Sequence, residues 1–515
     1  MRDRAEALVN PFPRTPSGPH CLVLTASRSV GDAAQGADTA RGSTFRVAPS
    51  GGDDTQRLQA ALDAATLAGP GSVIELSSGT FRVGRPLVGM NLDVTIRGAG
   101  MGQTEVIADG SVNQNGLFQL LPADENAVLR TIPFPQPILF LFQEGDVDRF
   151  GQPAVRRSQR IVMTDLTLGA AGRTPRHFDI NEGRDTRRLF SLVWIEGNRP
   201  DWTNSRDQTP ADIGAIDAEH AQVSTVRGSF LRVHFDGGNR ARSDTESGEA
   251  FARNPDVRNG FGVEGGGTLD ADSPIGFWFK PVNAALLFAD SRFSDLPGQA
   301  GIFAPQLVGP RDPSWTFGPE AVGADVTVTR SVFDHVWAGA ILGDLSEVNV
   351  LFDSSEFRPM VVGALVLTNF QSTEGGSIGY PPSVPSRVRV SASAFQGDVS
   401  VLMDEYFGPP LADLMVDDNA FVLVGGSQIG VLGNSVAGAR IIDNHFEGEG
   451  YGAVVAVSSS GWQIHGNDFC NLDIPQSATA PPDLLVDRPL PVNESQTPVV
   501  LVDSVDIGAT DNACA

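Results

Sequence analysis

The sequence has little positive charge, and almost none of it comes from lysine. Lys280 is the only lysine, every other basic residue is arginine or histidine, and 62 acidic residues stand against 37 lysines and arginines. The net charge of −25 repels nucleic acid and anionic membranes, because both carry the same sign. Neither is therefore expected as a partner.

Cysteine is also scarce. The three cysteines, Cys21, Cys470 and Cys514, have neither the spacing of a metal site nor that of a disulfide framework. In the repeat described below, Cys470 and Cys514 fall one register position out of step. This predicts that the two side chains face opposite sides and that both thiols are free.

Long hydrophobic runs are missing from the first 50 residues. The segment Met1–Pro19 is charged and proline-rich, and Cys21–Leu24 is much shorter than the apolar core of a secretion signal or a membrane span. This favours a protein that stays inside the cell, or one whose leader is absent from the sequence. Ser27–Ser43 consists of small and polar residues, so residues 1–50 are predicted to be a partly mobile extension.

A short phrase near the C-terminus is repeated. Asn444-His445-Phe446 returns as Asn467-Asp468-Phe469, and each copy follows a brief alternation of apolar and polar residues. Between them lies the apolar run Ala453–Val457, which is bounded by glycines and too short for a helix. A repeat made only of short strands is typical of a parallel β-solenoid, in which each coil buries its inner face against its neighbours.

The same phrase extends through the second half of the chain. Asn or Ser stands two residues before an apolar residue in Ser291-Arg292-Phe293, Ser331-Val332-Phe333, Ser355-Glu356-Phe357, Ser393-Ala394-Phe395, Asn419-Ala420-Phe421 and Asn512-Ala513-Cys514. The intervals fit one coil, or one coil with an inserted loop. We expect the Asn and Ser side chains to bond to their equivalents one coil away, with the Phe rings stacked inside.

The segment Gly51–Ile107 has a different composition. Asp53 or Asp54 is placed to cap a helix over Asp54–Leu67, whose apolar side would close the open end of the solenoid. Short strand-like runs follow it. This segment resembles the N-terminal entry of the pectate-lyase-like right-handed parallel β-helix superfamily, which includes pectate lyases, polygalacturonases, phage tailspikes, alginate-modifying enzymes and inulin fructotransferases.

The resemblance implies an all-β protein, a single-stranded right-handed parallel β-helix with an N-terminal capping helix. It would span residues 51–515, with long insertions near residues 197–212, 234–259 and 475–498, the last of which braces the C-terminal end or mediates a homotrimer. By analogy of fold, an extracellular or periplasmic location is favoured. Members of the superfamily differ in chemistry, and the motifs of its polygalacturonases, pectate lyases and alginate epimerases are not found here.

In this superfamily the substrate normally lies along the strands that follow the Asn/Phe strands. In this sequence those strands often open with glycine, and polar residues stand at or just after their ends: Glu144, Glu196, Glu264, Lys280, Asp344, Asn369, Asp404 and Glu405. Acidic residues at strand ends can simply form a solvated rim. A groove edged by carboxylates is the functional interpretation.

Cleavage of a glycosidic bond needs paired carboxylates, one protonated and one ionised. We therefore predict a carbohydrate-active protein, hydrolase-like or fructotransferase-like, that acts on a polysaccharide or oligosaccharide without a required cofactor. The predicted catalytic residues are Asp404, Glu405 and Asp344, and the predicted substrate contacts are Glu264, Lys280, Tyr406, Asn369 and Trp202. Two alternatives stay open: a Ca²⁺-assisted lyase with Lys280 or an arginine as base, and a non-catalytic glycan-binding solenoid.

Overall fold

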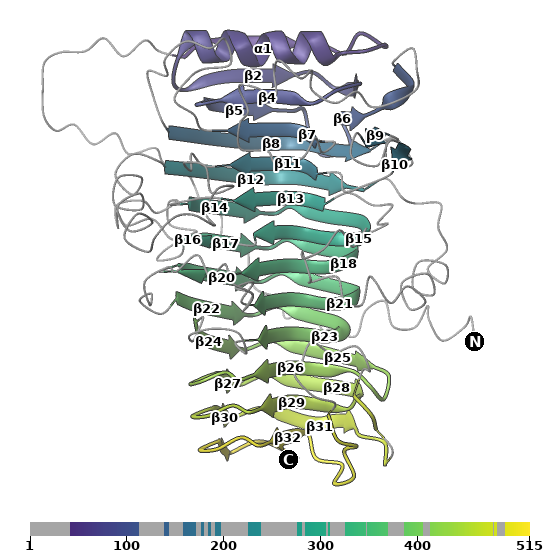
Figure 1. Ribbon diagram of the computed structural model, residues 1–515, viewed down its shortest axis with the longest axis vertical. Coiled ribbons are helices and arrows are strands. Elements are labelled where there is room, and N and C mark those ends of the chain that lie inside the picture. The colour runs from purple at the N-terminus through teal and green to yellow at the C-terminus, as the bar shows by residue number, and fades with distance from the viewer. Residues whose placement is uncertain are drawn as a thin grey trace, which may run out of the picture. The chain divides into compact units, whose positions relative to one another are not determined.

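The computed structural model describes residues 42–112, 138–143, 158–170, 177–179, 184–186, 191–196, 225–237, 275–280, 284–304, 307–308, 325–343, 345–346, 348–368, 386–404, 412–476, 478–480 and 490–514. The chain divides into two units, residues 1–39 and 40–515, and every described residue belongs to the second. This second unit is a right-handed parallel β-helix, as the sequence predicted. Its coils stack from the helix α1 (Thr55–Ala68) to the strand β32 (Val499–Val502) (Figure 1).

Each coil passes through three parallel ladders of strands. We call them the first, second and third ladder, in the order in which the chain passes through them. Strands form because apolar residues alternate, as in Ser72–Leu76, where Ile74 and Leu76 point into the core. The first ladder contains β1 (Thr44–Val47), β2 (Ser72–Leu76), β5 (Asp93–Arg97), β8 (Ser158–Ala170), β12 (Thr225–Asp236), β14 (Ala284–Ala289), β17 (Val326–Thr329), β20 (Asn349–Asp353), β22 (Ser386–Ser391), β24 (Ala412–Asp417), β27 (Arg440–Ile442), β30 (Gln463–His465) and β33 (Gly508–Thr510).

The second and third ladders share several long, bent strands. The second contains β3 (Gly79–Val83), β6 (Thr104–Ala108), the later parts of β8 and β12, and the first parts of β15 (Arg292–Ala304), β18 (Val332–Gly343), β21 (Glu356–Thr368) and β23 (Ala394–Asp404), followed by β25 (Ala420–Val424), β28 (His445–Glu449) and β31 (Asp468–Asp473). The third contains β4 (Leu87–Met90), β7 (Ile138–Gln143), β11 (Ser191–Glu196), β13 (Ile275–Lys280), the later parts of β15, β18, β21 and β23, then β26 (Ile429–Asn434), β29 (Gly452–Val457) and β32.

Five short elements complete the described structure. They are the antiparallel pair β9 (His177–Asp179) and β10 (Arg184–Thr186), the parallel pair β16 (Leu307–Val308) and β19 (Leu345–Ser346), and the 3-10 turn η3 (Gly110–Val112).

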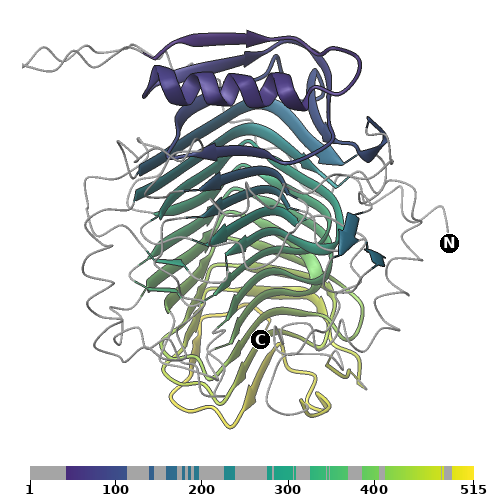
Figure 2. The same ribbon diagram turned by 45° about the horizontal axis from the view of Figure 1, so that its top comes forward.

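The N-terminal end is closed by α1, which lies across the first strands (Figure 2). Its apolar face, Leu58, Ala61, Leu62 and Ala65, is buried in the main core, as predicted. The capping differs in detail. Asp54 occupies the N-cap position, but its carboxylate accepts hydrogen bonds from the backbone N–H groups of residues 50 and 82, and Asp53 accepts from the backbone N–H of residue 55 instead.

The solenoid begins before the predicted boundary at Gly51. The strand Thr44–Val47 pairs in parallel with Val73–Leu76. Its short alternation, with Phe45 and Val47 packed against the core, supplies enough apolar surface to extend the first ladder by one strand.

The predicted ladder of Asn and Ser side chains is confirmed. In each coil the side-chain oxygen accepts a hydrogen bond from the backbone N–H of its equivalent in the preceding coil, for example Asn444 from Asn419 at 3.0 Å and Asn467 from Asn444 at 2.9 Å. The series runs through Ser291, Ser331, Ser355, Ser393, Asn419, Asn444, Asn467 and Asn512. These contacts satisfy buried backbone groups at the turn, so the repeated Asn and Ser are structural.

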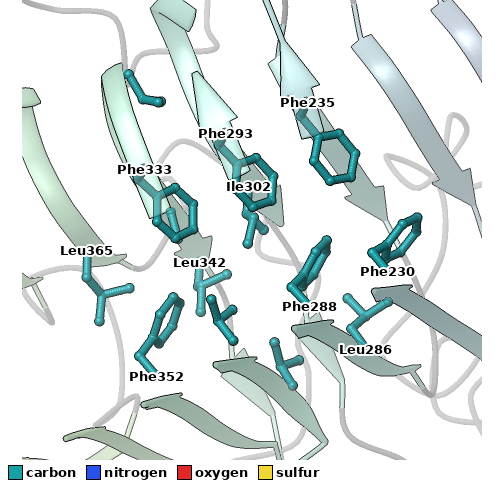
Figure 3. Packing of buried hydrophobic residues seen from close by; sticks show 14 of the residues in the cluster. Phe230, Phe235, Leu286, Phe288, Phe293, Ile302, Phe333, Leu342, Phe352 and Leu365 are labelled. Carbon is teal, nitrogen blue, oxygen red and sulfur yellow. The ribbon is translucent and has the colours of Figure 1, made fainter. Parts of the chain in front are cut away.

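The phenylalanines of the same phrase stack inside the second ladder (Figure 3). Ring centroids lie 4.6 Å apart for Phe235–Phe293 and Phe293–Phe333, and the stack continues through Phe357, Phe395, Phe421 and Phe446 to Phe469. The stack explains why the following strands open with glycine. A Cβ on Gly339 would come within 2.7 Å of the Phe357 ring of the next coil.

The prediction that Cys470 and Cys514 are free is wrong, because the two form a disulfide. Two departures from regular strand geometry bring them together. A register irregularity in β31 lies between the pairs His445–Asp468 and Glu447–Asn471, where Phe469 and Cys470 together face a single residue of β28. Cys514 has a positive φ of 56°, so its side chain leaves the alternation that the prediction assumed.

The proline-rich excursion after β31 lies against the third ladder. We call residues 474–498 the brace, of which the structure describes 474–476, 478–480 and 490–498. Ile474 and Ala478 are buried in one cluster with β26 and β29, and the buried Tyr451 hydroxyl donates to the Pro491 carbonyl at 2.7 Å. The excursion therefore braces the C-terminal coils, and a homotrimer stays a prediction.

Candidate functional site

The third ladder, where the sequence analysis placed the substrate, is apolar on both sides. In β21, Leu365 and Leu367 belong to the main core, whereas Val366 between them belongs to a second cluster on the outward side. The central outward row has one residue per strand: Val88, Leu141, Trp194, Trp278, Phe303, Ile341, Val366, Leu402, Leu432, Val455 and Val500. Those whose side chains the structure describes are buried, so these positions do not form the floor of an open groove.

The polarity of the third ladder changes at the position two residues after the central outward row on each strand. We call this set the strand-end row: Met90, Gln143, Glu196, Lys280, Gly343, Thr368, Asp404, Asn434, Val457 and Val502. Between Gln143 and Asn434 its residues are polar apart from Gly343, and β15 ends before reaching it. At either end the row becomes apolar. A polar strip is thus confined to the middle coils of the third ladder.

Two of the predicted site residues occupy this row. Asp404 ends β23 and is in register with Thr368 on one side and Asn434 on the other, whereas Lys280 ends β13 opposite Glu196. Four strand steps separate Lys280 from Asp404, which at about 4.8 Å per step is about 19 Å. Their register positions are therefore not adjacent.

The remaining predicted residues lie outside the described part of the chain. These are Glu405, Asp344, Glu264, Tyr406, Asn369 and Trp202. Asp344 directly follows Gly343, whose register position is two strands, or about 10 Å, from that of Asp404. The catalytic set proposed from the sequence stays a prediction.

Sequence reasoning gave too little weight to four members of the row. Glu196 was recognised only as one strand-end acid among several, and Gln143, Thr368 and Asn434 were overlooked because single polar residues at strand ends are common. The register is the signal that connects them, since each is paired in register with residues of the row on adjacent strands.

Buried polar residues occur in the row and on the strand that carries Asp404. Asn434 is 1% exposed, and Ser400 in β23 is fully buried with no hydrogen-bond partner for its hydroxyl. Such a group costs free energy unless something compensates for it. Ser400 lies on β23, the strand that ends at Asp404, and gives that strand a buried hydroxyl without a partner.

Carboxylates with lowered pKa values occur at corners of the solenoid and at the end of a second-ladder strand. Asp165 at a corner accepts hydrogen bonds from Arg232 at 2.6 and 2.9 Å, and this contact lowers its pKa. At Asp109, burial acts to raise the pKa, but hydrogen bonds from Ser111 and the contact with Arg82 together outweigh burial and lower the pKa. Asp325 is the opposite case, because burial raises its pKa. We assign Asp165 a structural role, since its contact with Arg232 favours the ionised carboxylate.

Within the described residues no group of His, Cys, Asp and Glu side chains could hold a metal ion, and a Ca²⁺ site stays a prediction. The same part of the chain has no helix long and apolar enough to cross a membrane.

Comparison with known proteins gives only distant likenesses. No protein-family model and no curated protein matches the chain. The chain is similar to the family 28 exopolygalacturonase of Yersinia enterocolitica (10% identity, 92% of this chain and 78% of that one, TM-score 0.41) and to the surface adhesin PfbA of Streptococcus pneumoniae (10% identity, 90% and 93%, TM-score 0.38). It is also similar to the A-module of the mannuronan C-5 epimerase AlgE6 of Azotobacter vinelandii (13% identity, 90% of each chain, TM-score 0.34).

The fold is a parallel β-helix, as the pairing of its own strands shows. The likenesses above are too distant to argue a function from. Enzymes and an adhesin both occur among them, so the activity of this β-helix has to be argued from its own residues.

Proposed function

We propose that this β-helix is carbohydrate-active and that it binds a polysaccharide or oligosaccharide along the strand-end row of the third ladder. The observation that carries the proposal is the strand-end row, in which Gln143, Glu196 and Lys280 share one register position on adjacent strands, as do Thr368 and Asp404 further along the ladder. A linear polymer laid parallel to the solenoid axis meets an equivalent strand end about every 4.8 Å. Carboxylate, amide, hydroxyl and ammonium groups are suitable partners for sugar hydroxyls.

The charge of the chain narrows the class of glycan. With a net charge of −25, the surface repels a polyuronate unless a cation intervenes. A neutral glycan carries no such penalty. We therefore propose a neutral polysaccharide or oligosaccharide as the first substrate class to test.

For the chemistry, we propose Asp404 as an acid/base or nucleophilic carboxylate, with Glu405 and Asp344 as its partners. Retaining glycosidases hold their two carboxyl groups about 5 to 5.5 Å apart, and inverting enzymes about 6.5 to 9.5 Å. One strand step matches the first spacing and two steps approach the second. Glu264, Lys280, Tyr406, Asn369 and Trp202 are proposed as substrate contacts, with Glu196 beside Lys280.

A second candidate function is a non-catalytic glycan-binding solenoid. It is supported by the wide spread of the polar strip, since the described carboxylates of the row, Glu196 and Asp404, stand five strand steps or about 24 Å apart. Binding needs no close carboxylate pair. The Ca²⁺-assisted lyase is the third alternative and requires a cation to neutralise a uronate.

The test is a panel of neutral and acidic glycans, each with and without Ca²⁺, followed by reducing-sugar release and by absorbance of unsaturated products. Asp404→Asn should lower the rate by roughly 100-fold to 10,000-fold, the range for loss of an acid/base group. The matched control is Asp418→Asn, an exposed acid at the corner before β25, where asparagine tolerates the positive φ of 55°. This control should keep full activity.

Each result has a distinct meaning. Activity that survives in Asp404→Asn would refute the catalytic assignment. Binding without turnover would favour the glycan-binding solenoid, and Ca²⁺-dependent formation of an unsaturated product would favour the lyase. If no glycan is bound or altered, the carbohydrate proposal itself fails.

A further inference from the structure

The two ends of the solenoid are protected very differently. The N-terminal end is covered by α1, whose apolar face is buried in the core. At the other end, the last coil is formed by residues 499–514, of which Val500 alone is buried. Leu501 is 48% exposed, although its equivalents in the two preceding coils, Ala456 and Gly433, are buried, and Val505 is 59% exposed. Among the described residues nothing lies over this end.

The noncovalent contacts of the last coil are those of any other coil, but on one side only. Its strands pair with β29 and β30, the Asn512 side chain accepts from the backbone N–H of Asn467 at 2.9 Å, and the Ser504 hydroxyl accepts from the backbone N–H of Ser459 at 3.0 Å. Since coils are stabilised by both of their neighbours, a terminal coil with one neighbour is the first to detach.

A covalent link compensates for the missing neighbour. The disulfide Cys470–Cys514 joins the end of the last coil to β31 across 44 residues. The loop that it closes contains the last coil and also the brace, which packs on the outward side of the third ladder beside Leu432 and Val455. One bond therefore constrains both segments.

We propose that the Cys470–Cys514 disulfide is a redox-sensitive lock that holds the last coil and the brace on the solenoid. The proposal does not depend on the proposed function. With the bond closed, the detached state of the loop is restricted. With the bond open, the last coil separates, exposes Ile464 and Phe469, and frees the edges of β29 and β30 to pair with another chain.

The opening reaction needs a dithiol as the co-reactant. A thiolate of the dithiol attacks one sulfur of the Cys470–Cys514 bond and forms a mixed disulfide, and its second thiol then displaces that cysteine. The dithiol is oxidised to a disulfide, and both cysteines gain a proton and become thiols. Both residues are exposed, so the reagent can reach the bond. An oxidising compartment keeps the lock closed.

The size of the effect follows from loop closure. For a loop of 44 residues, loss of the cross-link shifts the equilibrium towards the detached state by roughly a thousandfold in the chain-entropy treatment. The shift should be local, because coils that keep two neighbours, such as those of β24 and β27, do not depend on the bond.

Hydrogen–deuterium exchange of the full chain, with and without dithiothreitol, tests the lock. We expect amides of residues 499–514 and of the described brace to exchange faster by up to roughly a thousandfold after reduction, while residues 412–449 keep their protection. The double variant Cys470→Ser with Cys514→Ser should behave like the reduced protein and ignore the reductant. Cys21→Ser is the matched control and should respond like wild type.

Three outcomes would overturn the proposal. They are equal protection of the last coil in oxidised and reduced protein, free thiols at both cysteines after air oxidation, and an equal increase of exchange in every coil. Reduction of the already folded wild type keeps the test valid if the double variant does not fold.

Discussion

The stack of phenylalanines offers a sharp quantitative test, because its members differ in how many neighbours they have. Phe357 lies in the middle, 1% exposed, with ring centroids 4.7 Å from both Phe333 and Phe395. Phe469 ends the stack and meets only Phe446, at 5.3 Å and tilted by 40°. Truncation to alanine should therefore cost more at Phe357 than at Phe469.

The magnitudes follow from cavity formation and stacking. Removal of a buried phenylalanine side chain typically lowers the free energy of unfolding by about 3 to 5 kcal/mol, and an aromatic pair contributes about 0.5 to 1.5 kcal/mol beyond its buried area. Phe357→Ala loses two stacked pairs and a tilted pair with Phe352, so we expect about 5 kcal/mol. Phe469→Ala loses one poor pair at the edge of the core, so we expect about 3 kcal/mol.

Urea denaturation followed by both circular dichroism and tryptophan fluorescence measures these losses. The two signals should give coincident transitions, because a solenoid that unfolds in parts has no single free energy of unfolding. Phe357→Leu is the matched control, since it keeps apolar volume but removes stacking, and its cost should be smaller than that of alanine. Equal costs at Phe357 and Phe469, or a loss below about 1 kcal/mol at Phe357, would refute the ladder as the source of stability.

Two further predictions concern the backbone and the corner charges. Gly339→Ala should lower the free energy of unfolding by about 1 to 3 kcal/mol or more, because the new Cβ would lie 2.3 Å from the carbonyl oxygen of residue 364. Gly425→Ala is the control. Gly425 has open space around it, so this substitution should be nearly neutral in the same urea assay. The Arg232 contact lowers the folded-state pKa of Asp165 below its ordinary value of 3.8, so its stabilisation is present above that pH and is lost as the pH falls through the folded-state pKa. Asp165→Asn should therefore weaken the pH dependence of thermal stability below about pH 4, and an unchanged pH profile would contradict the assignment.

The repeat could be predicted from the sequence because each coil is stabilised by the same few residues, which lie close together in the chain. Each coil needs a turn residue that accepts a neighbour's backbone N–H and an apolar side chain two positions later, and these leave a visible phrase such as Asn444-His445-Phe446. The capping helix was readable for the same reason, since its apolar face follows from helical spacing alone.

The site was harder to predict from the sequence, because its members come from different coils separated by insertions of variable length. Glu196 and Lys280 are far apart in the sequence, yet they are register partners on adjacent strands. Asp404 was found from the sequence as a strand-end acid, but its neighbours Thr368 and Asn434 follow only from the register. Strand-end polarity alone cannot distinguish a solvated rim from an aligned row.

The amino-acid sequence by itself determined the β-helix, its inward phenylalanine stack and its capped N-terminal end, because these depend on short-range alternation and on a phrase repeated in nearly every coil. Tertiary structure alone decided the disulfide between Cys470 and Cys514 and the packing of the brace on the third ladder. A register irregularity in β31 and a positive φ at residue 514 reverse the expected side-chain directions, and such local departures from strand geometry leave no periodic trace in the sequence.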